Sequence, residues 1–134
     1  MRILGIDYGE KYIGVAFADT NSILIAQPFE IVNNNGKELD RLAEIAKLKK
    51  IEKVILGYPR NLSGEATQQT EIVKEFGKKI ETHLALPLEY QDETLSSVVI
   101  QEELSEDTKG RKKRIDDQAA ALILQDYLEE EFRK

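Results

Sequence analysis

The sequence predicts one α/β domain in which helices flank a mixed five-stranded sheet, built from an antiparallel β-meander followed by β-α units. Three observations predict this fold. The chain has 134 residues, 41% of them hydrophobic, which suits one domain with its own core. Its first third carries strand-like runs joined by short turns, and the rest alternates helical periodicity with short apolar runs. Because no linker or repeat divides the chain, a single domain is predicted over residues 1–134.

The predicted elements follow from these patterns in chain order. Residues 2–8 are apolar almost throughout until Asp7, and residues 11–18 alternate after a tight turn, so the two segments predict a hairpin. The later elements are, in order, a strand over 28–33, a helix over 37–50, a strand over 53–57, a helix with Ile72, Val73, Phe76 and Ile80 on one face, a strand over 88–93, a helix over 96–104 and a last helix over 115–132. Since helices separate them, strands four and five are expected to run parallel to the first.

The residue inventory excludes several chemistries. The chain has no cysteine, which rules out disulfides, thiol catalysis and cysteine-bound zinc. Its one histidine, His83, lies near the end of a predicted helix, where the helix dipole favours a solvent-facing histidine. A two-histidine zinc site is also excluded, so the reactive groups of an enzyme would be carboxylates, lysines or a metal that they bind.

Charge and hydropathy indicate where in the cell the protein is expected and which partners it is not expected to have. The N-terminal residues do not follow the pattern of a secretion signal, and no apolar run approaches the ~20 residues of a membrane span. We therefore expect a soluble, cytoplasmic protein without a membrane partner. The net charge of −6 argues against a general nucleic-acid coat protein.

Carboxylates lie at the ends of three predicted elements. Asp7 closes the first strand, where a buried carboxylate is costly unless it is paired or binds a metal, although an Asp also commonly starts a hairpin turn. Asp92 and Glu93 close a later strand, and strand alternation allows only one of them to face a given site. Asp116 and Asp117 begin the last helix on either edge of its apolar stripe, where acids are also ordinary partners of the helix dipole, and periodicity does not choose between them. Together the three groups favour a metal site, because two-metal phosphodiester cleavage needs several converging oxygen ligands.

Four segments resemble the YqgF (RuvX) family, nucleases and Holliday-junction-resolvase-like proteins of the RNase H fold. They are RILGIDYGEKYIGVAFAD at the opening strand pair, VILGYPRNLSG with its G-x-P-x-x-x-x-G loop, LEYQDET at a strand ending in Asp-Glu, and KKRIDDQAAALILQDYL at the last helix. The segments occur in the family's order and at compatible spacings over nearly the whole chain. The resemblance therefore implies an RNase H-like fold.

The resemblance also implies roles for individual residues. The family's catalytic and metal-binding acids fall on Asp7, Glu93 and Asp116, the last because two alanines follow it by three and four residues. The implied cofactors are two Mg²⁺ or Mn²⁺ ions, which Asp7 would bridge. Two departures concern a phosphate contact: Tyr12 stands where many relatives carry a basic residue, and Thr-Leu-Ser follows Glu93 where an Arg is common.

A basic run directly precedes Asp116. Its five basic residues are Lys109, Arg111, Lys112, Lys113 and Arg114. Such a run is often a solvated loop, but its place next to a candidate catalytic acid favours phosphate binding. Lys11 and Arg60, in predicted loops at the same sheet edge, are further candidates for binding nucleic acid.

The resemblance implies a nuclease that processes the 5′ end of pre-16S rRNA. Its partner would be nucleic acid, RNA rather than branched DNA, with pre-ribosomal particles as a further partner; a monomer is favoured and a homodimer is the alternative. Three other functions stay open. A Holliday-junction resolvase would need a dimer. A non-catalytic, ribosome-associated binding module would keep the fold alone. A kinase of the actin or sugar-kinase type shares the I-D-x-G pattern, but it needs a second phosphate loop, for which the sequence has no repeat.

Overall fold

The computed structural model describes residues 1–58, 68–92 and 112–132, with residues 68, 69 and 112–117 described by their backbone alone. Within these residues, five strands form one sheet in the order β3-β2-β1-β4-β5. The strands are β1 (Arg2–Asp7), β2 (Tyr12–Asp19), β3 (Ile23–Asn33), β4 (Lys53–Tyr58) and β5 (Leu88–Asp92), and the helices are α1 (Glu38–Lys49), α2 (Gln68–Leu84) and α4 (Lys112–Phe132). The predicted fold class, a mixed five-stranded sheet flanked by helices, is confirmed.

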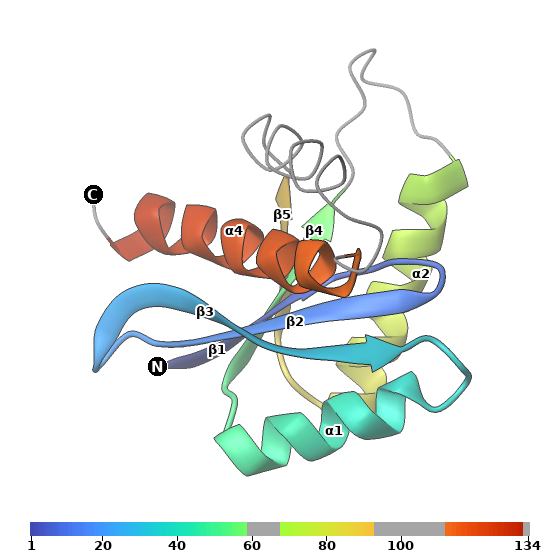
Figure 1. Cartoon of the computed structure of the whole chain (residues 1–134). Helices are drawn as coiled ribbons and strands as arrows, with labels where there is room; N and C mark the ends of the chain where they lie inside the picture. The colour runs from blue at the N-terminus through green and yellow to red at the C-terminus, as the bar shows by residue number, and fades with distance from the viewer. Residues whose placement is uncertain (59–67, 93–111, 133–134) are drawn as a thin grey trace.

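The strand directions bring three strand ends to one edge of the sheet. β2 pairs antiparallel with both β1 and β3, which forms the predicted meander. β4 runs parallel to β1, and β5 runs parallel to β4. The carboxyl ends of β1, β4 and β5 therefore lie at the same edge (Figure 1). This is the edge at which α/β folds place their ligands.

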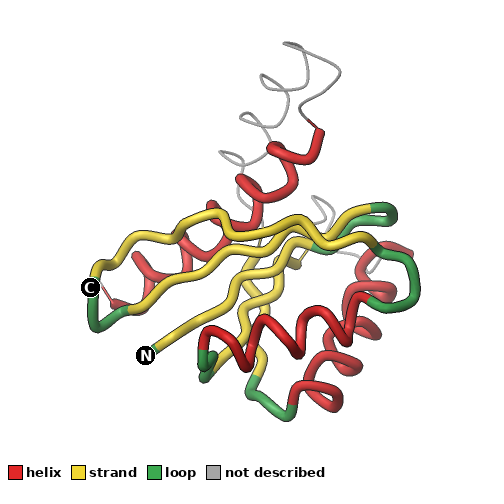
Figure 2. Tube along the Cα trace, turned by 60° about the horizontal axis from the view of Figure 1, so that its bottom comes forward, coloured by secondary structure: helices red, strands yellow, loops and turns green. Residues whose placement is uncertain are grey.

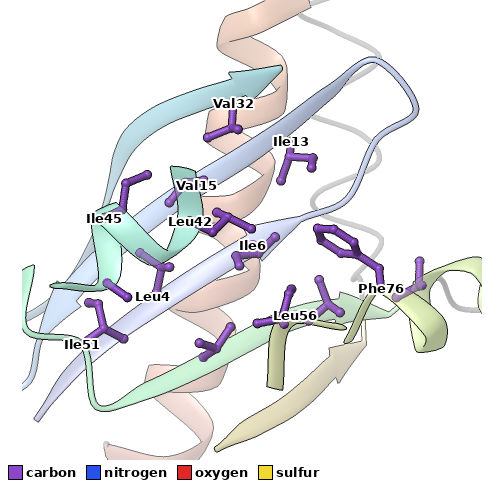
Figure 3. Packing of buried hydrophobic residues seen from close by; sticks show 14 residues of the cluster. Leu4, Ile6, Ile13, Val15, Val32, Leu42, Ile45, Ile51, Leu56 and Phe76 are labelled. Atoms are coloured by element: carbon purple, nitrogen blue, oxygen red, sulfur yellow. The ribbon is translucent and has the colours of Figure 1, made fainter. Parts of the chain in front are cut away.

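Helices cover both faces of the sheet (Figures 1 and 2). On one face, α1 and α2 pack over a core that includes Leu4, Ile6, Leu42 and Phe76 (Figure 3). On the other face, α4 packs over a smaller core that includes Ile3. Because side chains alternate along a strand, the neighbours Ile3 and Leu4 enter different cores.

Helix α4 approaches β1 closely at Gly5. A Cβ atom at Gly5 would lie 2.8 Å from the Cβ of Leu124 and 3.2 Å from the carbonyl oxygen of Ala120. The missing side chain thus lets the helix backbone approach the strand. The predicted apolar stripe of α4 is buried against the sheet, with Ala119 as an additional member: Ala119, Ala120, Ile123, Leu124, Tyr127 and Leu128.

Strand β3 begins at Ile23, earlier than the sequence predicted. Its first part is held by α4, because Leu24 and Ala26 pack against that helix and the side-chain amide of Gln125 bonds both of their backbones. The amide of Ala26 donates to Gln125 Oε1 over 2.8 Å, and Gln125 Nε2 donates to the carbonyl oxygen of Leu24 over 3.2 Å. Pro28 is tolerated inside the strand because β3 lies at an edge of the sheet.

The last helix also begins earlier than predicted. α4 starts at Lys112 rather than near residue 115, so the end of the basic run is helical and not part of a loop. Basic residues are unfavourable at a helix N-terminus, so the basic run carries no sequence signal for this earlier start. The predicted helix over 96–104 lies outside the described residues. Among the described helices, none combines the length and the apolarity that crossing a membrane requires.

Candidate active site

Asp7 is the last residue of β1 and is half-buried. Its side chain lies on the face of the sheet that α4 covers, because it follows Ile3 and Gly5 in the alternation of β1, and both of those residues contact α4. Leu4 and Ile6 point to the opposite core. Asp7 therefore lies on the same face as the residues of β1 that contact α4, at the carboxyl end of the strand.

The strands on either side of Asp7 carry no side chain next to it on this face. Gly14 of β2 is its direct partner in the antiparallel ladder. In β4, Gly57 follows Leu56, which pairs with Ile6. Gly57 lies on the α4 face because Ile55 belongs to the core under that helix. Asp7 thus lies between two glycines on this face, so neither neighbouring strand places a side chain directly beside it.

The N-terminal turns of α4 approach the same edge. Asp116 lies one helical turn before Ala120, whose carbonyl oxygen faces Gly5, and Asp7 lies two residues after Gly5 in β1. Figures 1 and 2 show the N-terminal half of α4 toward the end of the sheet where β1 turns into β2. The backbone therefore brings the helical segment with Asp116 toward Asp7, while the Asp116 side chain lies outside the described residues.

On β5, the α4 face is marked by Gln91, whose Nε2 donates to Glu130 of α4 over 3.3 Å. Tyr90 lies on the opposite face, where its hydroxyl reaches α2 at the position of Gly77. By the same alternation, Asp92 belongs to the α2 face, and it is exposed. Asp92 is therefore not beside Asp7. Glu93 follows it and lies outside the described residues.

The predicted basic residues are divided between described and undescribed segments. Lys11 is exposed in the turn between β1 and β2, at the end of the strand that carries Asp7. Lys112, Lys113 and Arg114 form the start of α4, described by backbone alone. Arg60, Lys109 and Arg111 lie outside the described residues. Without the side chains of Glu93 and Asp116, the described residues contain no group of three acids or histidines that could hold a metal ion.

The other end of α4 is anchored by Lys53. Its ammonium group donates to the hydroxyl of Tyr127 over 2.8 Å and pairs with the carboxylate of Glu89 at 2.9 Å. Burial opposes the charged form of Lys53, but these hydrogen bonds outweigh it and raise the pKa of Lys53 above its ordinary value. The link fixes α4 to β4 and β5 away from the carboxyl edge.

His83 lies far from this edge, near the end of α2, as the sequence predicted. Its Nε2 lies 3.0 Å from a carboxylate oxygen of Asp40 in α1, and its side chain is 41% exposed. His83 also lines a hollow of about 450 Å³ between α1 and α2. That hollow is on the opposite side of the sheet from Asp7, so His83 has no place in the candidate site.

Comparison with known proteins identifies the family. Residues 1–130 match the model of the RuvX family, which is described as Holliday junction resolvase. The chain belongs to the RuvX family. A relative from Streptococcus mutans is 41% identical and one from Streptococcus pneumoniae is 37% identical, each alignment covering 98% of this chain and 100% of the relative. Both of these RuvX relatives carry the provisional name pre-16S rRNA nuclease.

Solved structures identify the fold of this RuvX chain. RuvC of Thermus thermophilus in complex with a Holliday junction aligns with a TM-score of 0.61 at 14% identity, covering 97% of this chain and 94% of that one. The fowlpox virus resolvase with junction DNA aligns with a TM-score of 0.56 at 17% identity, covering 98% and 99%. The predicted RNase H-like fold is therefore confirmed.

Proposed function

We propose that this RuvX chain is a metal-dependent nuclease that hydrolyses phosphodiester bonds with Asp7, Glu93 and Asp116. The position of Asp7 carries the proposal: a half-buried carboxylate at the carboxyl edge, between two glycines, in line with the start of α4. The family description and the names of the relatives support the same activity.

The donor set of the proposed site fits Mg²⁺ or Mn²⁺. It consists of carboxylates alone, and these hard cations prefer oxygen ligands. Two such ions, when bound, lower the pKa of a water for in-line attack on phosphorus and stabilise the leaving oxygen. The protein's part is to hold the carboxylates in place on β1, after β5 and on α4. Without cations, three carboxylates would repel the anionic phosphodiester.

Strand and helix positions support the choice within each pair of acids. Asp92 belongs to the α2 face, which leaves Glu93 as the better partner for Asp7. In α4, the positions three, four and seven residues after Asp116 are Ala119, Ala120 and Ile123, and all three are buried against the sheet. Position 121, four residues after Asp117, is only half-buried. Asp116 thus has the more central place on the helix face toward the sheet.

The start of α4 suits a phosphate-binding role. No acidic residue lies in its first described turn, which instead contains Lys112, Lys113 and Arg114. The unpaired amides of a helix N-terminus already attract anions, and three cations add to that attraction at a cost in helix stability. A nucleic-acid phosphate would offset this cost. We propose that these residues bind the substrate together with Lys11, Arg60, Lys109 and Arg111.

For the substrate, we propose RNA, and specifically the 5′ end of pre-16S rRNA in the cytoplasm, within or near pre-ribosomal particles. The names of the relatives support this choice. The charge distribution agrees, because an acidic chain with one dense basic run contacts few phosphates, whereas a junction resolvase contacts several duplex arms, usually as a dimer. The second candidate is a Holliday-junction resolvase, which the family description and the junction-bound structural neighbours favour.

A comparison of initial cleavage rates in Mn²⁺ at low salt separates these candidates. The substrates are an RNA hairpin with a single-stranded tail and a DNA four-way junction, and Asp7→Asn is the inactive control. We expect faster cleavage of the RNA, complete dependence on metal and no cleavage by the variant. Symmetric nicking of the junction by a dimer, faster than RNA cleavage, would establish the resolvase instead. If the folded wild type cuts neither substrate, the proposed activity is wrong.

A further inference from the structure

The turn between β1 and β2, residues 8–11, is tightly held although it lies on the surface. At its start, the ring of Tyr8 packs on Phe76 of α2 with 4.6 Å between ring centroids. A Cβ atom on Gly9 would collide with the backbone carbonyl oxygen of Tyr12, so the turn closes only around glycine. The main chain that follows Asp7 is thus held by the packing of Tyr8 on α2 and by the close contact between Gly9 and Tyr12.

Asn34 makes the second anchor of this turn. Its side-chain Nδ2 donates to the carbonyl oxygen of Gly9 over 2.9 Å, and its backbone amide donates to the carbonyl oxygen of Lys11, also over 2.9 Å. Asn34 directly follows the last residue of β3, so it joins the far end of the meander to the turn beside Asp7. One residue therefore satisfies two backbone carbonyls on either side of Glu10.

The two bonds from Asn34 leave other groups of the turn free of contact with Asn34, namely the amide of Glu10 and the side chain of Lys11. In a trans peptide the amide hydrogen points opposite to the carbonyl oxygen, so the amide of Glu10 points away from Asn34. The Lys11 side chain is exposed, and no described carboxylate lies within ion-pair distance of it. The result is a rigid backbone that presents a cation four residues after Asp7.

The neighbouring asparagines lack this connection. Asn35 accepts a hydrogen bond from the amide of Lys37, two residues away, which is an ordinary local turn contact. Asn33 is exposed, and its backbone pairs with Tyr12 in the sheet. Only the side chain of Asn34, among these three, reaches 25 residues back along the chain to the turn at the candidate site.

We propose that Asn34 is a positioning residue, which fixes the β1–β2 turn so that Lys11 binds a backbone phosphate of the nucleic acid next to the bond that is cut. The inference rests on the proposed nuclease function and adds to it a source of substrate affinity. Because the backbone of Lys11 is already fixed, less conformational entropy is lost when its side chain binds a phosphate. Asn34 acts through Lys11 and touches neither the substrate nor the metal-binding acids.

The test compares Asn34→Ala with the matched control Asn33→Ala. Binding of a fluorescein-labelled RNA hairpin with a tail is measured by anisotropy in Ca²⁺, and cleavage of the same RNA is measured in Mn²⁺. For Asn34→Ala we expect Kd and KM to rise about five- to tenfold, the loss of roughly one charge-assisted contact, with kcat changed less than about twofold. Asn33→Ala should match the wild type.

A double-mutant cycle with Lys11→Ala distinguishes positioning from a general effect on folding. If Asn34 acts through Lys11, adding Asn34→Ala to Lys11→Ala should not weaken binding further. The inference would be overturned if the double variant lost the sum of the two single losses in binding. It would also be overturned if Asn34→Ala lowered kcat as much as it raised KM, or if it left RNA binding unchanged. Asn34→Asp serves if the alanine variant does not fold, because its carboxylate keeps the size but cannot donate to Gly9.

The RNA-binding measurement in Ca²⁺ tests this inference separately from the proposed nuclease function. If the wild type binds RNA but does not cut it in Mn²⁺, the nuclease proposal fails, while the Ca²⁺ titrations still decide the role of Asn34. If the wild type cuts RNA and Asn34→Ala binds as tightly as the wild type, only the positioning role fails. Absence of RNA binding by the wild type would overturn both.

Discussion

Asp7 and Asp92 both end strands at the carboxyl edge, yet they belong to opposite faces of the sheet. A shift of one residue along a strand moves a side chain to the other face. Acids that are neighbours in a strand sequence can therefore lie on opposite faces of the sheet although both carry a carboxylate. The same reasoning applies to Asp116 and Asp117 in α4, which differ in how centrally their positions face the sheet.

Neutral variants of the paired acids test these assignments. Glu93→Gln and Asp116→Asn, like Asp7→Asn, should lower kcat by orders of magnitude with folding intact, because each removes a ligand from a shared metal site. Asp92→Asn and Asp117→Asn should have mild effects, within about threefold. The measurement is cleavage of the tailed RNA hairpin with metal in excess. If Asp117→Asn is inactive and Asp116→Asn is active, the helix register assigned here is wrong.

The residue pattern alone predicted the candidate acids, and the choice of Asp7, Glu93 and Asp116 among them came from the family resemblance and stays a prediction. Asp7 could be placed at a strand end because three apolar residues precede it. The face on which Asp92 lies follows from contacts made by Tyr90 and Gln91 with two different helices, which no local pattern contains. Asn34 falls between the predicted strand over 28–33 and the predicted helix over 37–50, and its partner Gly9 is distant in sequence, so the contact had no sequence signal.

Among the elements, α4 packs closely on β1, the strand that carries Asp7. Gly5→Ala should lower the free energy of unfolding by about 1–3 kcal/mol, because the new methyl group meets the Cβ of Leu124 and the helix backbone at Ala120. Activity should fall as well, since the helix must move away from β1. Urea denaturation and cleavage assays measure the two effects.

Gly77→Ala is the matched control for this substitution. Its added methyl group meets the hydroxyl end of Tyr90, a flexible side chain that is 40% exposed and can move. Alanine also favours the helix by about 1 kcal/mol over glycine. The stability of Gly77→Ala should therefore stay within about 1 kcal/mol of the wild type. Equal losses for both variants would contradict the special role of the Gly5 contact.

Lys53 predicts how the anchoring of α4 depends on pH. Since the pKa of Lys53 is raised in the folded state, its stabilisation is fully present below the ordinary lysine pKa of 10.5 and is lost as the pH rises through the folded value. The difference in unfolding free energy between the wild type and Lys53→Met should shrink as the pH increases above 10.5. Urea denaturation over this range measures it, and a pH-independent difference would count against the pairing.

Element boundaries departed from the sequence prediction where tertiary contacts decide them. β3 extends to Ile23 because α4 covers Leu24 and Ala26 and supplies Gln125 to their backbones, more than 90 residues away. The apolar stripe of α4 was predicted correctly, since a helix buries one face at a fixed period. In α2 the prediction holds for Val73, Phe76 and Ile80, which are buried, but it was wrong for Ile72, which is exposed at the edge of that face.

For the molecule as a whole, the net charge is negative although one segment of the chain is strongly positive. The chain carries −6 overall, but it concentrates cations in the run before Asp116. Binding of nucleic acid should therefore depend on few phosphates. We expect the logarithm of the affinity for RNA to fall with the logarithm of salt concentration with a slope of only about −2 to −4.

Replacing Lys112, Lys113 and Arg114 with Ala should flatten this slope and raise KM more than it lowers kcat. The removed charges bind the substrate in the ground state as well as in the transition state, which mainly affects KM. Anisotropy titrations at several salt concentrations measure the slope. Substitution of Lys74, Lys78 and Lys79 on α2 by Ala gives a control with the same change in net charge, and an equal effect there would mean that overall charge is responsible.

The most direct test of the central claim is equilibrium binding of Mn²⁺ by calorimetry. Wild-type protein is compared with Asp7→Asn and with Asp92→Asn, an acid at the same edge but on the other face. We predict that the wild type and Asp92→Asn bind Mn²⁺ alike and that Asp7→Asn loses about tenfold or more in affinity. Mn²⁺ binding that is unaffected by Asp7→Asn, or no binding by the folded wild type, would contradict a metal-dependent site at Asp7 and favour a binding module without catalysis.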